Sequence, residues 1–157
     1  MRTIELGGGN NPQYRPNYDI RPLPNVDIVI DLNYPIPVPD NSYELVFSRY
    51  FIEHVSYRNI DNLFREMYRI LVPAGNAIIV TANLFEQAKV LLNTSQWNQK
   101  LISMIFGEQN YNENAHQCGF SPEYITRIMK NIGFKDIKIE PIYTEVGPTD
   151  MTVRATK

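Results

Sequence analysis

The sequence predicts an α/β fold built on a mainly parallel β-sheet. Short β-branched runs alternate with segments of helical spacing along the chain, which is the pattern of such a fold. The last two predicted strands are only about eight residues apart, too close for a parallel crossover, so they should pair antiparallel. A chain of 157 residues with 43% hydrophobic content fits one domain, residues 1–157.

The first third of the chain is expected to contain strands and no helix. Strands are predicted at three apolar or β-branched runs, Thr3–Leu6, Val26–Ile30 and Tyr43–Phe47. Seven of the eleven prolines lie between Pro12 and Pro39. Because proline lacks an amide donor and clashes inside a helix, residues 12–25 should form an extended, turn-rich connection.

The rest of the chain alternates helices with strands. Tyr57–Leu71 is the clearest helix, because its apolar side chains recur every three or four residues, and Ser56 is its expected cap. A helical pattern also covers residues 85–106, and a further helix should begin at Ser121-Pro122 and end at Gly133. Strands are predicted at Ala77–Thr81, Phe134–Ile142 and Met151–Thr156.

Composition excludes several classes of function. The net charge is −2 and no basic run exceeds two residues, so a broad nucleic-acid surface is not expected. The single cysteine, Cys118, excludes an internal disulfide and a cysteine-based zinc cluster, and with only two histidines no metal site is expected. No apolar run reaches the length of about 18 residues that a membrane helix needs. Since the first residues do not resemble a signal peptide, we expect a soluble, cytoplasmic protein.

Polar residues follow several predicted strands, and ligands bind outside the carboxyl ends of parallel strands. The triplet Gly7–Gly9 allows close approach of a ligand, and its amides could hold a carboxylate or phosphate. We therefore expect valine at Gly7 to harm binding more than stability. Asp19 and Asp31 could accept hydrogen bonds from ribose hydroxyls or an adenine amino group. The alternatives are a tight turn without a ligand and two turn-capping aspartates.

The two histidines are candidate proton acceptors. His54 follows the Tyr43–Phe47 strand and could act as a general base, because imidazole titrates near neutrality. A loop histidine that only hydrogen-bonds to the backbone is the alternative. His116 precedes a capped helix and could reach the same cleft, or could simply be packed or exposed.

An ordered series of motifs runs along the chain: Glu5-Leu6-Gly7-Gly8-Gly9, Asp31-Leu32, Pro35–Val46, Phe51–Val55, Arg65–Gly75 and Gly119–Phe134. In this order they resemble the class I S-adenosylmethionine-dependent methyltransferases, with the small type-11-like enzymes as the most similar subgroup. The first of them resembles motif I of that family. The resemblance covers about residues 3–140 and implies a Rossmann-like three-layer sandwich whose last strand is antiparallel.

The resemblance also implies roles for individual residues and S-adenosylmethionine as the cofactor. Around the methionine part of the cofactor would lie Glu5, Gly7, Gly8 and Gly9, with Arg49 or Tyr50 beside the methionine or sulfonium region. Asp19 would hold the ribose hydroxyls, and Asp31 and Leu32 would flank the adenine. His54 would be a substrate-side base.

The methyl acceptor implied by the resemblance is a small molecule, and residues 84–118 are the expected acceptor-side insert. The sequence departs from the family where Asn11-Pro12 replaces the third glycine of motif I and where prolines occupy the place of the first helix. These departures leave two alternatives open, a non-catalytic binding module of the same fold and another nucleotide-binding enzyme such as an NAD-dependent reductase. A second subunit could cover the open end of the cleft, so a homo-oligomer is also considered.

Overall fold

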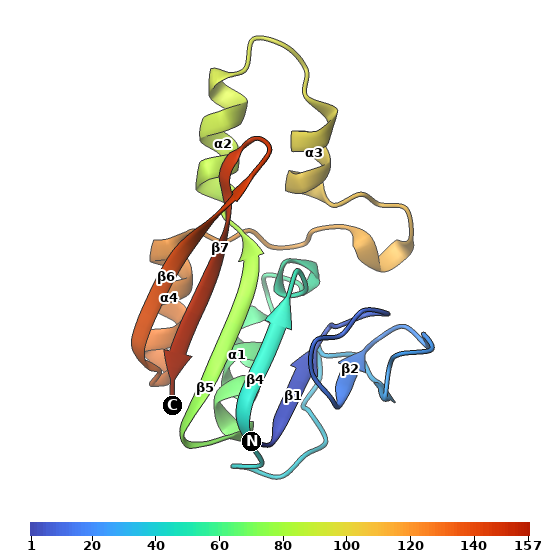
Figure 1. Ribbon diagram of the computed structural model, residues 1–157, viewed down its shortest axis with the longest axis vertical. Coiled ribbons are helices and arrows are strands. Elements are labelled where there is room, and N and C mark those ends of the chain that lie inside the picture. Colours follow the sequence, from blue (N-terminus) through green and yellow to red (C-terminus); the bar gives the residue numbers. More distant parts are fainter.

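Seven strands form one sheet in the computed structural model, which describes residues 1–157 (Figure 1). Their order across the sheet is β3-β2-β1-β4-β5-β7-β6. The strands are β1 (Thr3–Leu6), β2 (Asn17–Asp19), β3 (Ile28–Val29), β4 (Tyr43–Arg49), β5 (Leu71–Ala82), β6 (Lys135–Thr144) and β7 (Gly147–Thr156). Only β7 runs antiparallel to its neighbours, β5 and β6. The predicted α/β class and the antiparallel last strand are therefore confirmed.

Four α-helices accompany the sheet, and they are unevenly distributed. They are α1 (Ile60–Ile70), α2 (Leu84–Asn93), α3 (Gln99–Phe106) and α4 (Pro122–Ile132), with short 3-10 turns at Ile52–His54 and Asn112–Asn114. Helices α1 and α4 lie on one face of the sheet and enclose the core, whereas α2 and α3 stand beyond the carboxyl ends of the strands (Figure 1). None of the helices is both long and apolar enough to span a bilayer.

The face of the sheet opposite α1 and α4 is covered in part by a loop and not by a helix. No helix forms between β1 and β2 or between β2 and β3, in agreement with the proline content of this region. The β1–β2 connection covers part of this face, because the ring of Tyr14 packs against Phe47 of β4 with centroids 5.1 Å apart. Only 5% of the surface of Phe47 is exposed. Helices α1 and α4 therefore cover one face of the sheet, and the β1–β2 connection covers part of the other (Figure 1).

Local signals explain where the sequence-based prediction differs from the structure. The predicted helix over 85–106 is two helices, because Asn98 interrupts it and caps α3 by accepting a hydrogen bond from the Leu101 amide at 3.0 Å. Ser56 does not cap α1, which follows Asn59 without a side-chain cap. Ser121 does cap α4, and its oxygen accepts from the Tyr124 amide at 3.1 Å, as expected.

A guanidinium clamp fixes the proline-rich segment before β4 onto α1. Arg69 donates to the Val38 and Ile36 carbonyl oxygens at 2.8 and 2.9 Å and forms a two-bond pair with Glu66 at 2.7 and 2.8 Å. Glu66 in turn accepts from the Ile36 amide at 2.7 Å, and its bond to Arg69 is the main reason that its pKa is lowered. This clamp positions the chain that connects β3 to β4.

We expect Arg69→Lys to lower the free energy of unfolding by about 1–3 kcal/mol, since an ammonium cannot reproduce the planar fork that reaches the carboxylate and the carbonyls together. Urea denaturation measures the change. The matched control is Arg127→Lys in α4, whose exposed ion pair with Glu123 spans 3.6 Å and should contribute less than about 0.5 kcal/mol. Equal stability of the two variants would contradict the role of the clamp.

Candidate functional site

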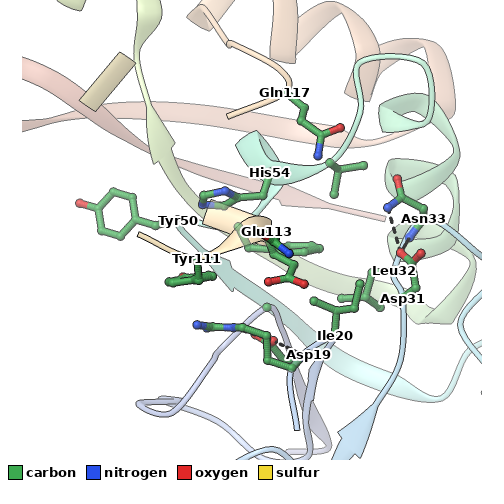
Figure 2. A pocket seen from close by; sticks show the side chains of 15 residues that line it. Asp19, Ile20, Asp31, Leu32, Asn33, Tyr50, His54, Tyr111, Glu113 and Gln117 are labelled. Atoms are coloured by element: carbon green, nitrogen blue, oxygen red, sulfur yellow. Dashed lines mark hydrogen bonds and ion pairs between the residues drawn. The ribbon is translucent and has the colours of Figure 1, made fainter. Parts of the chain in front are cut away.

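A cavity of about 210 Å³ opens at the carboxyl ends of β1, β2 and β4, where a parallel sheet places its ligands. The strand ends and the chain after β3 contribute Gly7, Asp19, Ile20, Arg21, Asp31, Leu32 and Asn33. The segment after β4 contributes Tyr50, Phe51, His54 and Val55, and the segment before α4 contributes Tyr111, Asn112, Glu113 and Gln117. Figure 2 shows His54 and Tyr111 on one side of this cavity and Asp31 and Leu32 on the other.

The structure brings together six of the ten residues predicted for the site. Those six that line the cavity are Gly7, Asp19, Asp31, Leu32, Tyr50 and His54. The other four, which lie outside its lining, are Glu5, Gly8, Gly9 and Arg49. The predicted residues thus separate into a group that can touch a ligand and a group that supports the surrounding loop.

The amides of Gly7–Gly9 are all used within the chain. They donate, in order, to the Tyr18 carbonyl at 2.7 Å, to Asn17 Oδ1 at 3.0 Å and to Asp19 Oδ2 at 2.9 Å. An amide that already donates to a protein acceptor is not free to bind an anion. The expectation that this turn holds a carboxylate or phosphate through its amides is therefore wrong.

The packing around Gly7 leaves no room for a side chain, whether or not a ligand binds. Its φ of +73° lies in the left-handed region, and a Cβ there would overlap the ring of Phe51. Replacement by valine would force the Phe51 side chain and the backbone to move. We therefore expect such a change to lower stability as well, because the fold itself needs glycine here, and its relative effect on binding stays a prediction.

Glu5 fixes the β1–β2 connection by hydrogen bonds to its backbone. Its side chain is buried, with 1% exposed, and Oε2 accepts from the amides of Gln13 and Tyr14 at 2.5 and 2.7 Å. Burial raises the pKa of this carboxyl group, which the two backbone hydrogen bonds partly offset. Glu5 therefore shapes the loop that carries the glycine turn.

Two carboxylates face the cavity from the ends of adjacent strands. Asp31 Oδ1 accepts from the amide and the side-chain nitrogen of Asn33 at 2.9 and 2.8 Å, which leaves Oδ2 for another donor. Asp19 is more fully engaged, because Oδ2 accepts from Gly9 and Oδ1 accepts from the backbone and Nε of Arg21. Since each carboxylate oxygen has two lone pairs, Asp19 can still accept from a ligand hydroxyl.

The segment before α4 belongs to the expected insert 84–118 and forms a wall of the cavity, but the sequence did not indicate which residues of the sheet it contacts. The guanidinium of Arg21 lies 4.5 Å from the ring centroid of Tyr111, a cation–π contact that joins the end of β2 to this distant segment. Tyr111 lies on the same side of the cavity as His54, and Glu113 also lines the cavity (Figure 2). The cation–π contact joins residues about ninety positions apart, so no local pattern could have indicated it.

Burial shifts the pKa of His54, His116 and Glu53 near the cavity. The His54 ring lies edge-on to His116 with centroids 4.8 Å apart, and burial lowers the pKa of both histidines, so both are neutral at neutral pH. Glu53 has 2% of its surface exposed, accepts from Thr81 Oγ1 at 3.0 Å, and has its pKa raised by burial to about 7. No group of three or more His, Cys, Asp or Glu side chains is placed to hold a metal ion.

The raised pKa of Glu53 predicts a stability that depends on pH. A carboxyl group whose pKa is about 7 in the native state and about 4.5 when unfolded keeps its proton longer in the native state, so its contribution declines as pH rises between those values. In the wild type, Glu53 should lower the free energy of unfolding by up to about 3 kcal/mol between pH 5 and pH 8, and we expect Glu53→Gln to abolish this decrease. Urea unfolding at both pH values tests this. The same decline in variant and wild type would show that Glu53 ionises normally.

Comparison with known proteins agrees with this geometry. The model of a methyltransferase domain family matches residues 2–139. A search of curated proteins gives no significant match. Among solved structures, a SAM-dependent methyltransferase from Archaeoglobus fulgidus is 18% identical with a TM-score of 0.71, and the match covers 99% of this chain and 86% of that one.

Two further structures show the same likeness. An S-adenosylmethionine-dependent methyltransferase from Mesorhizobium loti is 17% identical with a TM-score of 0.69, and the match covers 99% of this chain and 90% of that one. Phosphoethanolamine N-methyltransferase 2 of Haemonchus contortus, in complex with S-adenosyl-L-methionine, is 16% identical with a TM-score of 0.66, over 100% of this chain and 48% of that one.

The resemblance stated from the sequence motifs is confirmed at the level of the family, while the type-11-like subgroup stays a prediction. The matched region includes every strand that contributes to the cavity. With the fold shared along its whole length, the chain belongs to the methyltransferase domain family and has the fold of class I S-adenosylmethionine-dependent methyltransferases.

Proposed function

We propose that this methyltransferase binds S-adenosylmethionine in the cavity at the carboxyl ends of β1, β2 and β4 and transfers its methyl group to a small molecule. The observation that carries the proposal is the pair of carboxylates, Asp19 and Asp31, that face an apolar wall within this cavity. Carboxylates suit the hydroxyl and amino donors of an adenosyl group, and the buried Leu32 suits its flat base.

The lining residues divide into roles that fit the parts of the cofactor. Asp31 Oδ2, which no group of the chain engages, would accept from the adenine amino group, with Leu32 and Ile20 against the base. Asp19 accepts from ribose hydroxyls, and Tyr50 lies beside the methionine part. Four further residues, Glu5, Gly8, Gly9 and Arg49, act by shaping the loops around the cavity.

The bound cofactor supplies an electrophilic methyl group, and the chain supplies position and proton transfer. In-line displacement needs the acceptor atom about 3 Å from the methyl carbon and a site without competing water. The side chains of Tyr111 and Glu113 cover the cavity, and the neutral ring of His54 lies where it can accept a proton from the acceptor. His54 is thus the proposed substrate-side base.

Residues 84–118 are proposed as the acceptor-side insert. This segment contains α2 and α3, which rise beyond the carboxyl ends of the strands (Figure 1). It ends in the stretch that contributes Tyr111 and Glu113 to the cavity, so the same segment contacts both cofactor and acceptor.

One observation favours a second candidate function, a non-catalytic binding module of the same fold. The amides of Gly7–Gly9 donate to groups of the chain itself, so they add nothing to cofactor affinity. A module of this kind would keep the fold and bind the cofactor weakly.

Isothermal titration distinguishes the candidates. We expect saturable binding of S-adenosylmethionine and S-adenosylhomocysteine and no binding of NAD, because the cavity offers carboxylates and no free amide cradle for a pyrophosphate. Binding of NAD alone would indicate a different nucleotide enzyme. Absence of binding by all three compounds would favour the non-catalytic module.

We expect Asp31→Ala to weaken S-adenosylhomocysteine binding by about 1–3 kcal/mol, the range for removing a charge-assisted hydrogen bond. Titration calorimetry gives the affinity, and the melting temperature reports folding. Glu140→Ala is the control, because Glu140 lies exposed on β6, away from the cavity. If both variants bind like the wild type, Asp31 does not contact the adenosyl group.

A further inference from the structure

A second cavity, of about 520 Å³, adjoins the first and shares Tyr50, His54 and Tyr111 with it. Its remaining walls come from the end of β5, from α2 and α3, from the segment between α3 and α4, and from β7. A molecule in this cavity would be separated from a ligand in the first cavity only by the shared side chains, such as Tyr50 and His54. That is the position from which an acceptor would approach the cofactor.

The charged side chains around this second cavity are all acidic. Three carboxyl groups line it, those of Glu53, Glu108 and Asp150, and no lysine or arginine does. The two histidines in its wall, His54 and His116, are neutral at neutral pH because burial lowers the pKa of each. The cavity therefore attracts cations and repels anions.

Asp150 is held in a defined orientation toward this space. Its Oδ2 accepts from the hydroxyl of Tyr50 at 2.9 Å, and 6% of the residue is exposed. Its Oδ1 makes no hydrogen bond within the chain. On the pairing strand, Ala82 lies opposite Asp150 and also lines the cavity. One carboxylate oxygen is thus free for a ligand.

A second observation, independent of the acidic groups, also points to a ligand. Gln87 of α2 lines this cavity with only 1% of its surface exposed, and its Nε2 has no hydrogen-bond partner. A buried amide without a partner costs roughly 1–3 kcal/mol. Since Nε2 is an N–H donor, an acceptor atom of a bound molecule, such as a hydroxyl oxygen, would satisfy it.

We propose that the methyl acceptor is a primary or secondary amine, held as its ammonium form by Asp150 and Glu53 in the second cavity. This inference rests on the proposed function of the first cavity. An acidic or phosphorylated acceptor would be repelled by the same carboxylates. A neutral alcohol could donate a hydrogen bond to them but would lack the attraction between opposite charges that an ammonium gains. The rings of Tyr50 and Tyr111 and the thioether of Met104 offer surface for the hydrocarbon part of the amine.

An ammonium must lose a proton before it can react. It gives one proton to the neutral ring of His54, which lines both cavities and is the proposed substrate-side base, and this leaves a neutral nitrogen with a lone pair. That pair forms the N–C bond while the C–S bond breaks with its electrons moving to sulfur. The product is a methylated ammonium and a neutral thioether, so charge and atoms balance.

Binding of three probes of one shape tests the proposal, using 2-phenylethylamine, 2-phenylethanol and phenylacetate. Protein saturated with S-adenosylhomocysteine is titrated by calorimetry with each. We expect the amine to bind at least tenfold more tightly than the alcohol, and phenylacetate not to bind. Propylamine is a smaller amine probe. Absence of binding by both amines, or equal or tighter binding of the alcohol or acid, overturns the proposal.

Variants locate the effect in the second cavity. We expect Asp150→Asn to weaken 2-phenylethylamine binding about tenfold and to leave S-adenosylhomocysteine affinity unchanged, since asparagine keeps the shape and the bond to Tyr50. Glu140→Gln on β6 is the control for removing a negative charge elsewhere. Unchanged amine affinity in Asp150→Asn would refute the assignment. Loss of S-adenosylhomocysteine binding in the wild type would instead refute the proposed function of the first cavity.

Discussion

Three buried polar side chains, Glu5, Asn17 and Asp19, hold the connection between β1 and β2, and the arrangement of the site depends on them. With no helix after β1, the backbone groups of this connection have no helical partners and must find others. Glu5 accepts two of the amides and Asn17 and Asp19 accept one each. The glycine turn is therefore fixed from within, at the cost of its free donors.

This internal satisfaction changes what the cavity offers a ligand. Recognition falls to side chains at the strand ends, Asp19 and Asp31, and to the apolar Leu32, because the turn contributes close backbone approach but no free amide. The contact of Arg21 with Tyr111 then brings the insert over the same cavity. The segment that contains Tyr111 thus supplies a wall of the cavity next to the short β1–β2 connection.

The two cavities differ in chemistry although they share a wall. The first combines carboxylates with an apolar surface and contains Arg21. The second contains carboxyl groups without a cation, and burial raises the pKa of both Glu53 and Asp150 there. Burial disfavours the charged form of both carboxyl groups, and a bound cation would favour it, since the low dielectric penalises an unpaired charge. Tyr50 joins the two sites, with its hydroxyl bonded to Asp150.

The sequence by itself indicated six of the seven strands, their order along the chain, the capped α4 helix and the candidate residues Asp19, Asp31 and His54, because hydrophobic spacing, proline and capping signals act over a few residues. The three-residue strand β2 lies in the stretch predicted to be an extended connection. It also indicated the family, through motifs that recur in order. Only the tertiary structure decided that the glycine amides are satisfied and that Tyr111, Gln87 and Asp150 line the cavities. Those features depend on contacts between distant segments, such as Tyr50 with Asp150, and no local pattern of residues encodes them.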